Sequence, residues 1–129
     1  MMRITVARRI FAELISQLSG RYAVLDNQVD ALLAPHELVE RLSDCDGALI
    51  TGGDRIDADL LRSCPRLKVV SNIAVGFNNI DVAACTAAGV AATNTPDVLN
   101  EATADHAWAL LLAAARRVAE GDRYVRAGS

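Results

Sequence analysis

Two strand-like segments enclose a helix-like one in residues 48–71, ALITGGDRIDADLLRSCPRLKVVS. The strand-like segments, residues 48–50 and 67–71, are short and mostly apolar, as strands are when helices cover both faces of a sheet. The segment between them, residues 56–61, is helix-like, and the loop-to-helix transition at its start is rich in Asp. Because parallel neighbours need a crossover connection and a helix is the usual one, this stretch predicts a βαβ unit.

The same alternation continues in both directions along the chain. Five strand-then-helix units in a row predict an α/β fold, with a parallel five-stranded sheet and flanking helices. An open sheet of this size most often takes the flavodoxin-like order 2-1-3-4-5, which binds ligands beyond the carboxyl ends of its strands. The other expected strands are residues 4–6, 22–25 and 90–93, and the other expected helices are residues 11–18, 35–42, 80–88 and a long helix from about residue 100 onward.

The composition is typical of one soluble globular domain. The chain has 129 residues, of which 52% are hydrophobic and 22% charged. A net charge of -3 without a dense Lys or Arg block argues against a nucleic-acid partner. Cys45, Cys64 and Cys85 form no C-x-x-C pair and the N-terminus resembles no signal peptide, so reduced thiols and a cytoplasmic location are expected. The longest apolar run, residues 107–115, is about half of the roughly 18 to 20 residues that a membrane span needs, so no membrane partner is expected.

The last expected helix is apolar nearly all round. A five-stranded domain covers only one face of such a helix, so we expect a second chain or further protein mass to cover the rest. The end of the chain, residues 123–129, is expected to lead into something further on. One apolar stripe at helical spacing contains Ala104, Ala107, Trp108, Leu111, Ala115 and Val118, and Leu110, Leu112 and Ala113 extend the apolar surface.

Two blocks of sequence resemble a known family. LKVVSNIAVGFNNID, residues 67–81, is similar to a stretch of the D-isomer-specific 2-hydroxyacid dehydrogenases. GVAATNTPDVLNEATADHAW, residues 89–108, resembles the same family's next strand and the start of its domain-crossing helix. The spacing of the blocks also matches, so the resemblance covers about residue 47 to the end, and the earlier residues are compatible with it. Within the family, TPDVL and ADHAW are most similar to the glyoxylate, hydroxypyruvate and 2-ketogluconate reductases.

The resemblance implies the N-terminal substrate-binding domain of a two-domain oxidoreductase. Residues 1–98 are expected to form that domain, and residues 99–129 the interdomain helix and the start of a dinucleotide-binding domain. The chain contains no G-x-G-x-x-G, and Gly52-Gly53 is no substitute, so we expect a chain truncated before the dinucleotide-binding motif. The catalytic Arg, Glu and His of the family are implied to lie in later segments, so no catalytic residue is assigned here.

The resemblance also implies the reaction and the partners of the complete enzyme. That enzyme would transfer hydride between NAD or NADP and a small 2-keto acid or D-2-hydroxy acid of the glyoxylate or hydroxypyruvate type. The implied oligomer is a homodimer, held together largely by the missing dinucleotide domain. The present chain alone is expected to be inactive and to bind the cofactor only weakly.

Three residues are candidates for substrate binding. The resemblance implies that the backbone N–H groups of Val75 and Gly76 hold the substrate carboxylate, and that the backbone near Gly52 lines the substrate. A glycine lets the backbone approach a ligand closely, and successive amides can form a concavity that holds an anion. From the pattern alone, Gly76 can equally be a glycine needed only for a turn, and residues 51–54 can be a plain strand-to-helix loop.

Thr103 is the candidate for cofactor binding. The resemblance implies that it faces the nicotinamide or pyrophosphate side of the interdomain cleft. Alternatively, its hydroxyl bonds the backbone at a helix start, as Thr often does. Histidine is the usual proton donor near neutral pH, but His36 is expected to be a solvated surface residue and His106 to pack or cap the interdomain region.

Three acidic residues, Asp54, Asp57 and Asp59, stand where a loop enters a helix. Acidic residues at a helix N-terminus accept backbone hydrogen bonds and interact favourably with the helix dipole. We therefore expect a helix start here and no metal site.

A second interpretation treats the chain as complete in itself. It would then be a flavodoxin-like module that binds a small carboxylate, or one that pairs through its apolar final helix. In the pairing case we expect a dimer that buries Trp108 and Leu111.

Overall fold

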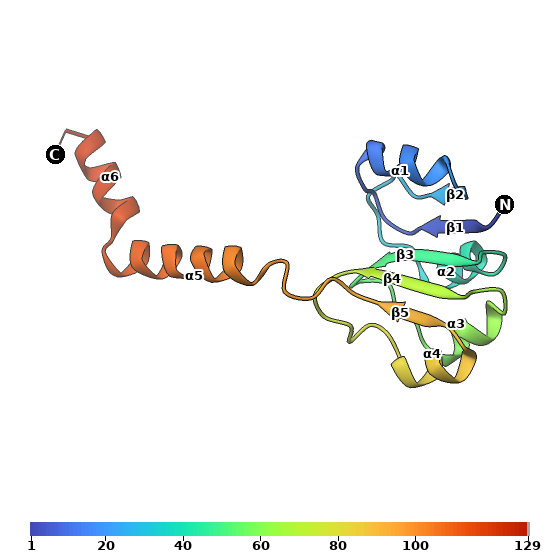
Figure 1. Ribbon diagram of the computed structural model, residues 1–129. Coiled ribbons are helices and arrows are strands. Elements are labelled where there is room, and N and C mark those ends of the chain that lie inside the picture. The colour runs from blue at the N-terminus through green and yellow to red at the C-terminus, as the bar shows by residue number, and fades with distance from the viewer. Residues whose placement is uncertain (129) are drawn as a thin grey trace. The chain divides into compact units, whose positions relative to one another are not determined.

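The computed structural model describes residues 1–128, and its contacts divide the chain into two units, the first of which is Met1–Pro96 (Figure 1). The first unit contains one parallel sheet with the strand order β2-β1-β3-β4-β5. This is the flavodoxin-like order that the alternating sequence pattern predicts. The strands are β1 (Arg3–Val6), β2 (Ala23–Asp26), β3 (Gly47–Thr51), β4 (Val69–Ile73) and β5 (Ala91–Thr93).

Four helices connect these strands: α1 (Ala12–Ser19), α2 (Pro35–Leu42), α3 (Ala58–Ser63) and α4 (Val82–Ala88). The expected helices at residues 56–61 and 80–88 each begin later than predicted, because an aspartate stops each helix from extending further back. The Asp57 carboxylate accepts the Leu60 N–H at 3.1 Å, and the Asp81 carboxylate accepts the Ala84 N–H at 2.9 Å. These are N-cap hydrogen bonds. The residues just before the caps, Ile56 and Ile80, pair as an isolated parallel bridge instead.

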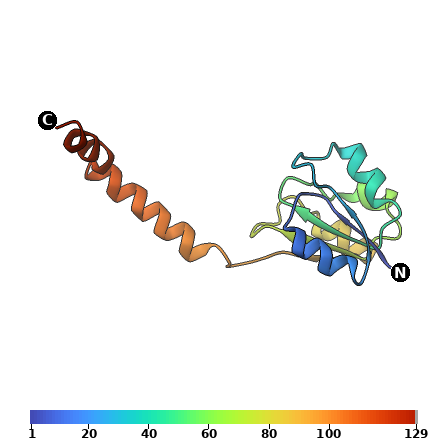
Figure 2. The same cartoon turned by 90° about the horizontal axis from the view of Figure 1, so that it is seen from above.

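The core lies on one face of the sheet, under α2, α3 and α4. There Leu42, Ile50 and Val70 are fully buried, and Leu60 and Leu61 join them from α3. Figure 2 shows α1 and α2 on opposite sides of the sheet. No residue of α1 is buried, whereas α2, α3 and α4 all contribute side chains to the core on the other face.

The face of the sheet under α1 is only partly covered. Leu49, which points to this face, lines a hollow with Leu14 and Leu18 of α1. Val69 and Ile73 of β4 keep 39% and 45% of their surface exposed. The apolar strands predicted that helices cover both faces of the sheet. Within the first unit, the face under α1 is covered by that single helix.

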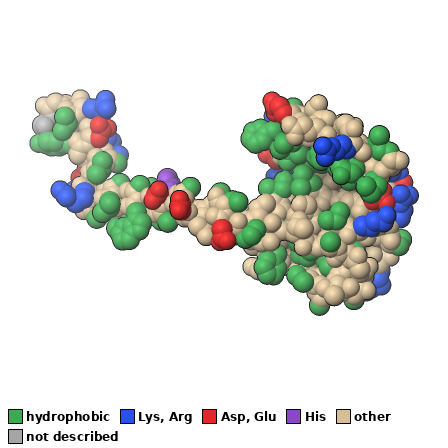
Figure 3. All heavy atoms as spheres, in the orientation of Figure 1, with side chains coloured by type: hydrophobic (Ala, Val, Ile, Leu, Met, Phe, Trp, Pro, Cys, Tyr) green, Lys and Arg blue, Asp and Glu red, His purple; other side chains and the backbone are tan. Residues whose placement is uncertain are grey.

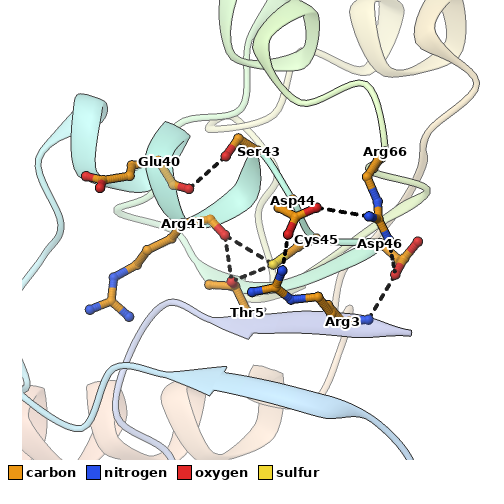
Figure 4. Close-up of polar contacts among 9 residues, drawn as sticks. All are labelled: Arg3, Thr5, Glu40, Arg41, Ser43, Asp44, Cys45, Asp46 and Arg66. Carbon is orange, nitrogen blue, oxygen red and sulfur yellow. Dashed lines mark hydrogen bonds and ion pairs between the residues drawn. The ribbon is translucent and has the colours of Figure 1, made fainter. Parts of the chain in front are cut away.

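An ion cluster holds the amino ends of β1 and β3 together (Figure 4). The Arg3 N–H donates to the Asp46 carboxylate at 2.9 Å, and the Arg3 guanidinium pairs with Asp44. Arg66 contacts both acids, at 2.9 Å to Asp44 and 3.4 Å to Asp46. The Arg3 hydrogen bond, assisted by the charges of Arg66 and Lys68 and opposed by burial, lowers the pKa of Asp46.

The second unit begins at Asp97 and contains two helices, α5 (Asn100–Ala115) and α6 (Val118–Arg126). The single long helix expected from residue 100 onward is therefore interrupted. Arg117 adopts a left-handed conformation, with φ 55° and ψ 35°, which ends the helical hydrogen-bond pattern. Its guanidinium Nε donates to Glu120 at 2.7 Å in the first turn of α6. No Pro or Gly marks this position, and Val118 of the predicted stripe lies on α6 instead of α5.

Apolar side chains lie exposed along both helices of the second unit (Figure 3). Neither helix has a buried residue. Trp108 on α5 is 63% exposed and Val125 on α6 is 74% exposed. Among the described residues, no helix combines the length and the apolar character that crossing a bilayer requires.

Candidate functional site

The carboxyl ends of β3, β4 and β5 meet at one edge of the sheet, and the loops that follow them form the candidate site. In open α/β sheets, ligands bind in the crevice outside these strand ends. A hollow of about 830 Å³ lies at this edge, lined by the ends of β3 and β4 at Thr51 and Ile73 and mostly by residues 9–14, and none of the predicted substrate residues lines it. This is the edge on which the sequence predicts Gly52, Val75 and Gly76.

Three successive carbonyl groups after β4 are held by hydrogen bonds. The carbonyl of Ala74 accepts a hydrogen bond from the Thr95 N–H at 3.0 Å. The carbonyl of Val75 accepts one from the side-chain amide of Asn94 at 2.8 Å. The carbonyl of Gly76 accepts the side-chain amide of Asn72 at 3.0 Å. All three distances are typical of well-formed hydrogen bonds.

The N–H groups beside these carbonyls have no such partners. No carbonyl or side chain of the described residues accepts from the N–H of Val75, Gly76 or Phe77, and we call these three residues the amide turn. A Cβ added at Gly76 would meet no heavy atom within 4 Å. The turn therefore presents unpaired N–H donors at a place where the backbone is open to approach.

The loop after β3 is held by Asp54, whose side chain is buried. Asp54 is 2% exposed, and its Oδ2 accepts both the Thr51 N–H at 2.8 Å and the Thr51 hydroxyl at 3.0 Å. Among the glycines of this loop, Gly53 is the confined one, since a Cβ there would lie 2.9 Å from Leu32 Cδ1. At Gly52 a Cβ would meet Ala74 Cβ at 3.7 Å, an ordinary contact. Gly52 is exposed, and packing does not require a glycine at this position.

An amide pair links this loop to the amide turn. Asn72 donates to Asn79 Oδ1 at 3.1 Å as well as to the carbonyl of Gly76. Asn79 in turn donates to the carbonyls of Thr51 at 3.1 Å and Asp54 at 2.8 Å. The loops after β3 and β4 are therefore joined through side chains.

Asn72, Asn79 and Asn94 were not singled out as site residues by the sequence analysis, although all three lie in the blocks that resemble the family. The available signal was Asn72, a polar residue inside an apolar strand, because a buried amide needs hydrogen-bond partners. Asn72 is 1% exposed and both of its recorded bonds reach the loop beyond β4.

Thr103 belongs to the second unit, whereas Gly52, Val75 and Gly76 belong to the first. It is exposed in the first turn of α5, where its N–H donates to the Leu99 carbonyl at 2.9 Å. Its hydroxyl bonds no described residue, so the alternative role of a bond to the helix-start backbone is not observed. His36 and His106 are both exposed.

The acidic residues before α3 do not share one role. Asp57 caps the helix, and the hydrogen bond from the Leu60 N–H is the main cause of its lowered pKa. Asp54 accepts hydrogen bonds from Thr51 within the loop after β3, and Asp59 forms an ion pair with Arg62. Residues 1–128 contain no group of three or more His, Cys, Asp or Glu side chains placed to hold a metal ion.

Comparison with known proteins gives the same family for almost the whole chain. The model of the D-isomer specific 2-hydroxyacid dehydrogenase catalytic domain matches residues 5–120. A glyoxylate reductase of Aeropyrum pernix is 46% identical over 128 residues, and one of Pyrococcus furiosus is 41% identical over 126 residues. Both alignments cover 98% of this chain and 38% of the reductase, so the chain spans well under half the length of these relatives.

Solved structures agree with the sequence comparison. A protein of Thermus thermophilus has a TM-score of 0.82 and 39% identity, with 98% of this chain and 41% of that protein covered. The NADPH-dependent glyoxylate/hydroxypyruvate reductase of Sinorhizobium meliloti has a TM-score of 0.76 and 27% identity, with 99% and 39% covered. The chain therefore belongs to the D-isomer specific 2-hydroxyacid dehydrogenase family and matches its catalytic domain.

Proposed function

We propose that this chain is the substrate-binding part of an oxidoreductase that transfers hydride between NAD(P)H and a small 2-keto acid, or back from a D-2-hydroxy acid. The observation that carries the proposal is the amide turn, whose N–H groups are unpaired and open. The relatives named glyoxylate reductase support a substrate of the glyoxylate or hydroxypyruvate type.

Backbone N–H groups suit a small carboxylate for two reasons. A hydrogen bond to a charged acceptor contributes about 1.5–3 kcal/mol, more than a bond between neutral groups. Successive amides also form a concavity in which one anion accepts several bonds. We propose that Val75 and Gly76 bind the carboxylate and that the exposed backbone at Gly52 lines the same substrate. Held in this way, the keto carbon has a fixed place relative to the rest of the enzyme.

The described residues suit the substrate better than the cofactor. NAD or NADP would supply or accept the hydride in the complete enzyme. The one residue proposed to face it is Thr103, and an exposed hydroxyl on a helix is not a dinucleotide site by itself. The glycine-rich turn of dinucleotide domains is absent from the sequence. We therefore propose tight cofactor binding only for the complete enzyme, which would also form the homodimer.

A binding measurement tests the substrate site in this chain. The ¹⁵N-labelled 129-residue chain is titrated with sodium glyoxylate while the backbone amide signals are followed. We expect saturable shifts at Val75, Gly76 and Gly52. Acetaldehyde has no carboxylate and should leave these signals unchanged, and sodium chloride controls for ionic strength. Equal shifts with acetaldehyde, or shifts scattered over the surface, would contradict the proposal.

A turnover measurement tests the enzymatic role. Alone, the chain is expected not to oxidise NADPH in the presence of glyoxylate or hydroxypyruvate. When it replaces the matching part of the Pyrococcus furiosus glyoxylate reductase, reductase activity should be retained. Robust oxidation by the isolated chain would overturn the first expectation, and a folded but inactive chimera would overturn the second.

The exposed apolar helices favour one alternative, a free-standing module that binds a carboxylate and pairs through α5. Trp108 and Leu111 are 63% and 56% exposed, so pairing would remove apolar surface from water. Light scattering and Trp108 fluorescence test it together. A dimer whose indole emission shifts to the red on dilution supports pairing, and a monomer at all concentrations contradicts it.

A further inference from the structure

The three anchored carbonyls also determine where the N–H groups of the amide turn point. A trans peptide group is planar, so its C=O and N–H point in opposite directions. No cis peptide bond occurs in the described residues. A hydrogen bond that fixes the carbonyl of residue 74, 75 or 76 therefore fixes the direction of the N–H of residue 75, 76 or 77.

We infer that Asn94 and Asn72 are positioning residues, whose side-chain amides orient the N–H groups that meet the substrate. This inference rests on the proposed function of the amide turn. Asn94 holds the Val75–Gly76 peptide through the Val75 carbonyl at 2.8 Å. Asn72 holds the next peptide through the Gly76 carbonyl at 3.0 Å. Neither side chain is proposed to touch the substrate.

Asn72 is itself held in one orientation. It is 1% exposed, and its amide nitrogen donates to Asn79 as well as to the amide turn. Asn79 donates its own amide protons to the carbonyls of Thr51 and Asp54. Asn72 Oδ1 is buried and accepts no hydrogen bond from the described residues, so a rotated amide would turn this oxygen toward the Gly76 carbonyl and Asn79 Oδ1, both of which need a donor. The direction of the amide turn is thereby coupled to the loop that contains Gly52.

The benefit of such anchors is that little ordering remains to be done when the substrate binds. A loop that has to be ordered by its ligand weakens the apparent affinity by the cost of ordering. Removal of one anchoring hydrogen bond, at a typical net contribution, should weaken glyoxylate binding roughly 3- to 10-fold.

Asn94→Ala tests the inference, and Asn78→Ala is the matched control. Asn94 is only partly exposed and lies beyond β5, outside the core. Asn78 is the same residue type, lies in the loop after β4 that contains the amide turn, and is exposed, and its side chain bonds no described residue. Order parameters and residual dipolar couplings of residues 75–77 are measured without ligand, followed by the glyoxylate titration.

We expect Asn94→Ala to lower the order parameter of the Gly76 amide from about 0.85, typical of rigid backbone, toward about 0.6. The glyoxylate Kd should rise by the factor given above, and Asn78→Ala should change neither quantity. Asn94→Asp keeps the shape of the side chain but, once ionised, has no proton to donate. It should loosen Gly76 as the alanine does.

The two proposals fail in different ways. If Gly76 stays equally ordered and equally oriented in both Asn94 variants, the positioning role is overturned, whatever glyoxylate does. If Gly76 loosens in the variants but glyoxylate moves none of the wild-type amides of residues 75–77, the positioning role stands and the proposed substrate site is overturned.

Discussion

Replacing Gly76 with alanine separates the two roles that a glycine can have in the amide turn. A Cβ there meets no heavy atom within 4 Å, and the φ angle of Gly76 lies outside the left-handed region. If the conformation of the turn does not need a glycine, the main effect of alanine is to lower the conformational entropy of the unfolded chain. We therefore expect the free energy of unfolding to stay constant or to rise by about 0.4–1 kcal/mol.

The expected effect on binding is opposite in sign. We expect the new methyl group to occupy part of the open space beside the Gly76 N–H and to hinder the approach of a carboxylate. Since a hydrogen bond to a charged group contributes about 1.5–3 kcal/mol, loss of this one should weaken glyoxylate binding roughly 10- to 150-fold.

Gly89→Ala is the control for the stability measurement. A Cβ at Gly89 also meets nothing within 4 Å, but its φ of 69° is left-handed and ends α4. Alanine there should cost about 1–2 kcal/mol. Urea unfolding followed by circular dichroism gives both free energies, and the amide titration gives the affinities. The reasoning is refuted if Gly76→Ala loses as much stability as Gly89→Ala while glyoxylate binding is unchanged, because Gly76 would then serve only the turn.

Three further predictions concern the first unit. Leu42→Ala removes a side chain that is 0% exposed and should lower the free energy of unfolding by about 2–5 kcal/mol in the same urea experiment. Asp57→Ala removes the bond to the Leu60 N–H and should cost about 1 kcal/mol at neutral pH. Folding lowers the pKa of Asp57 from its ordinary value of 3.8. The stability that the Asp57 carboxylate contributes is therefore fully present above pH 3.8 and is lost as the pH falls through the folded pKa. The urea midpoints of variant and wild type should converge in acid. Burial raises the pKa of the Cys64 and Cys85 thiols, so Ellman's reagent at pH 8 should react with them quickly only in urea, and fast reaction in the native protein would contradict their burial.

The order of strands and helices was predictable because short apolar runs alternate with helical ones. The boundaries were less so, since capping by Asp57 and Asp81 delays two helices by a few residues. The break before α6 had no sequence signal. It depends on the left-handed conformation of Arg117, which is uncommon for a residue other than glycine.

The site was predictable only as a set of residues. Family resemblance named Val75, Gly76, Gly52 and Thr103, and their roles stay predictions. The bonds that shape the turn join distant positions: Asn94 lies 19 residues beyond Val75, and Asn79 lies 28 residues beyond Thr51. Such contacts follow from the pairing of neighbouring strands, which spacing along a single sequence does not supply.

The short edge strand β5 has a consequence for the heat resistance of ligand binding. It has three residues, all exposed, and the two residues after it, Asn94 and Thr95, supply two of the three anchors of the amide turn. Short strands at a border fray before the centre of a sheet unfolds. On warming, affinity for the keto acid should therefore fade several degrees before the circular dichroism signal of the sheet is lost.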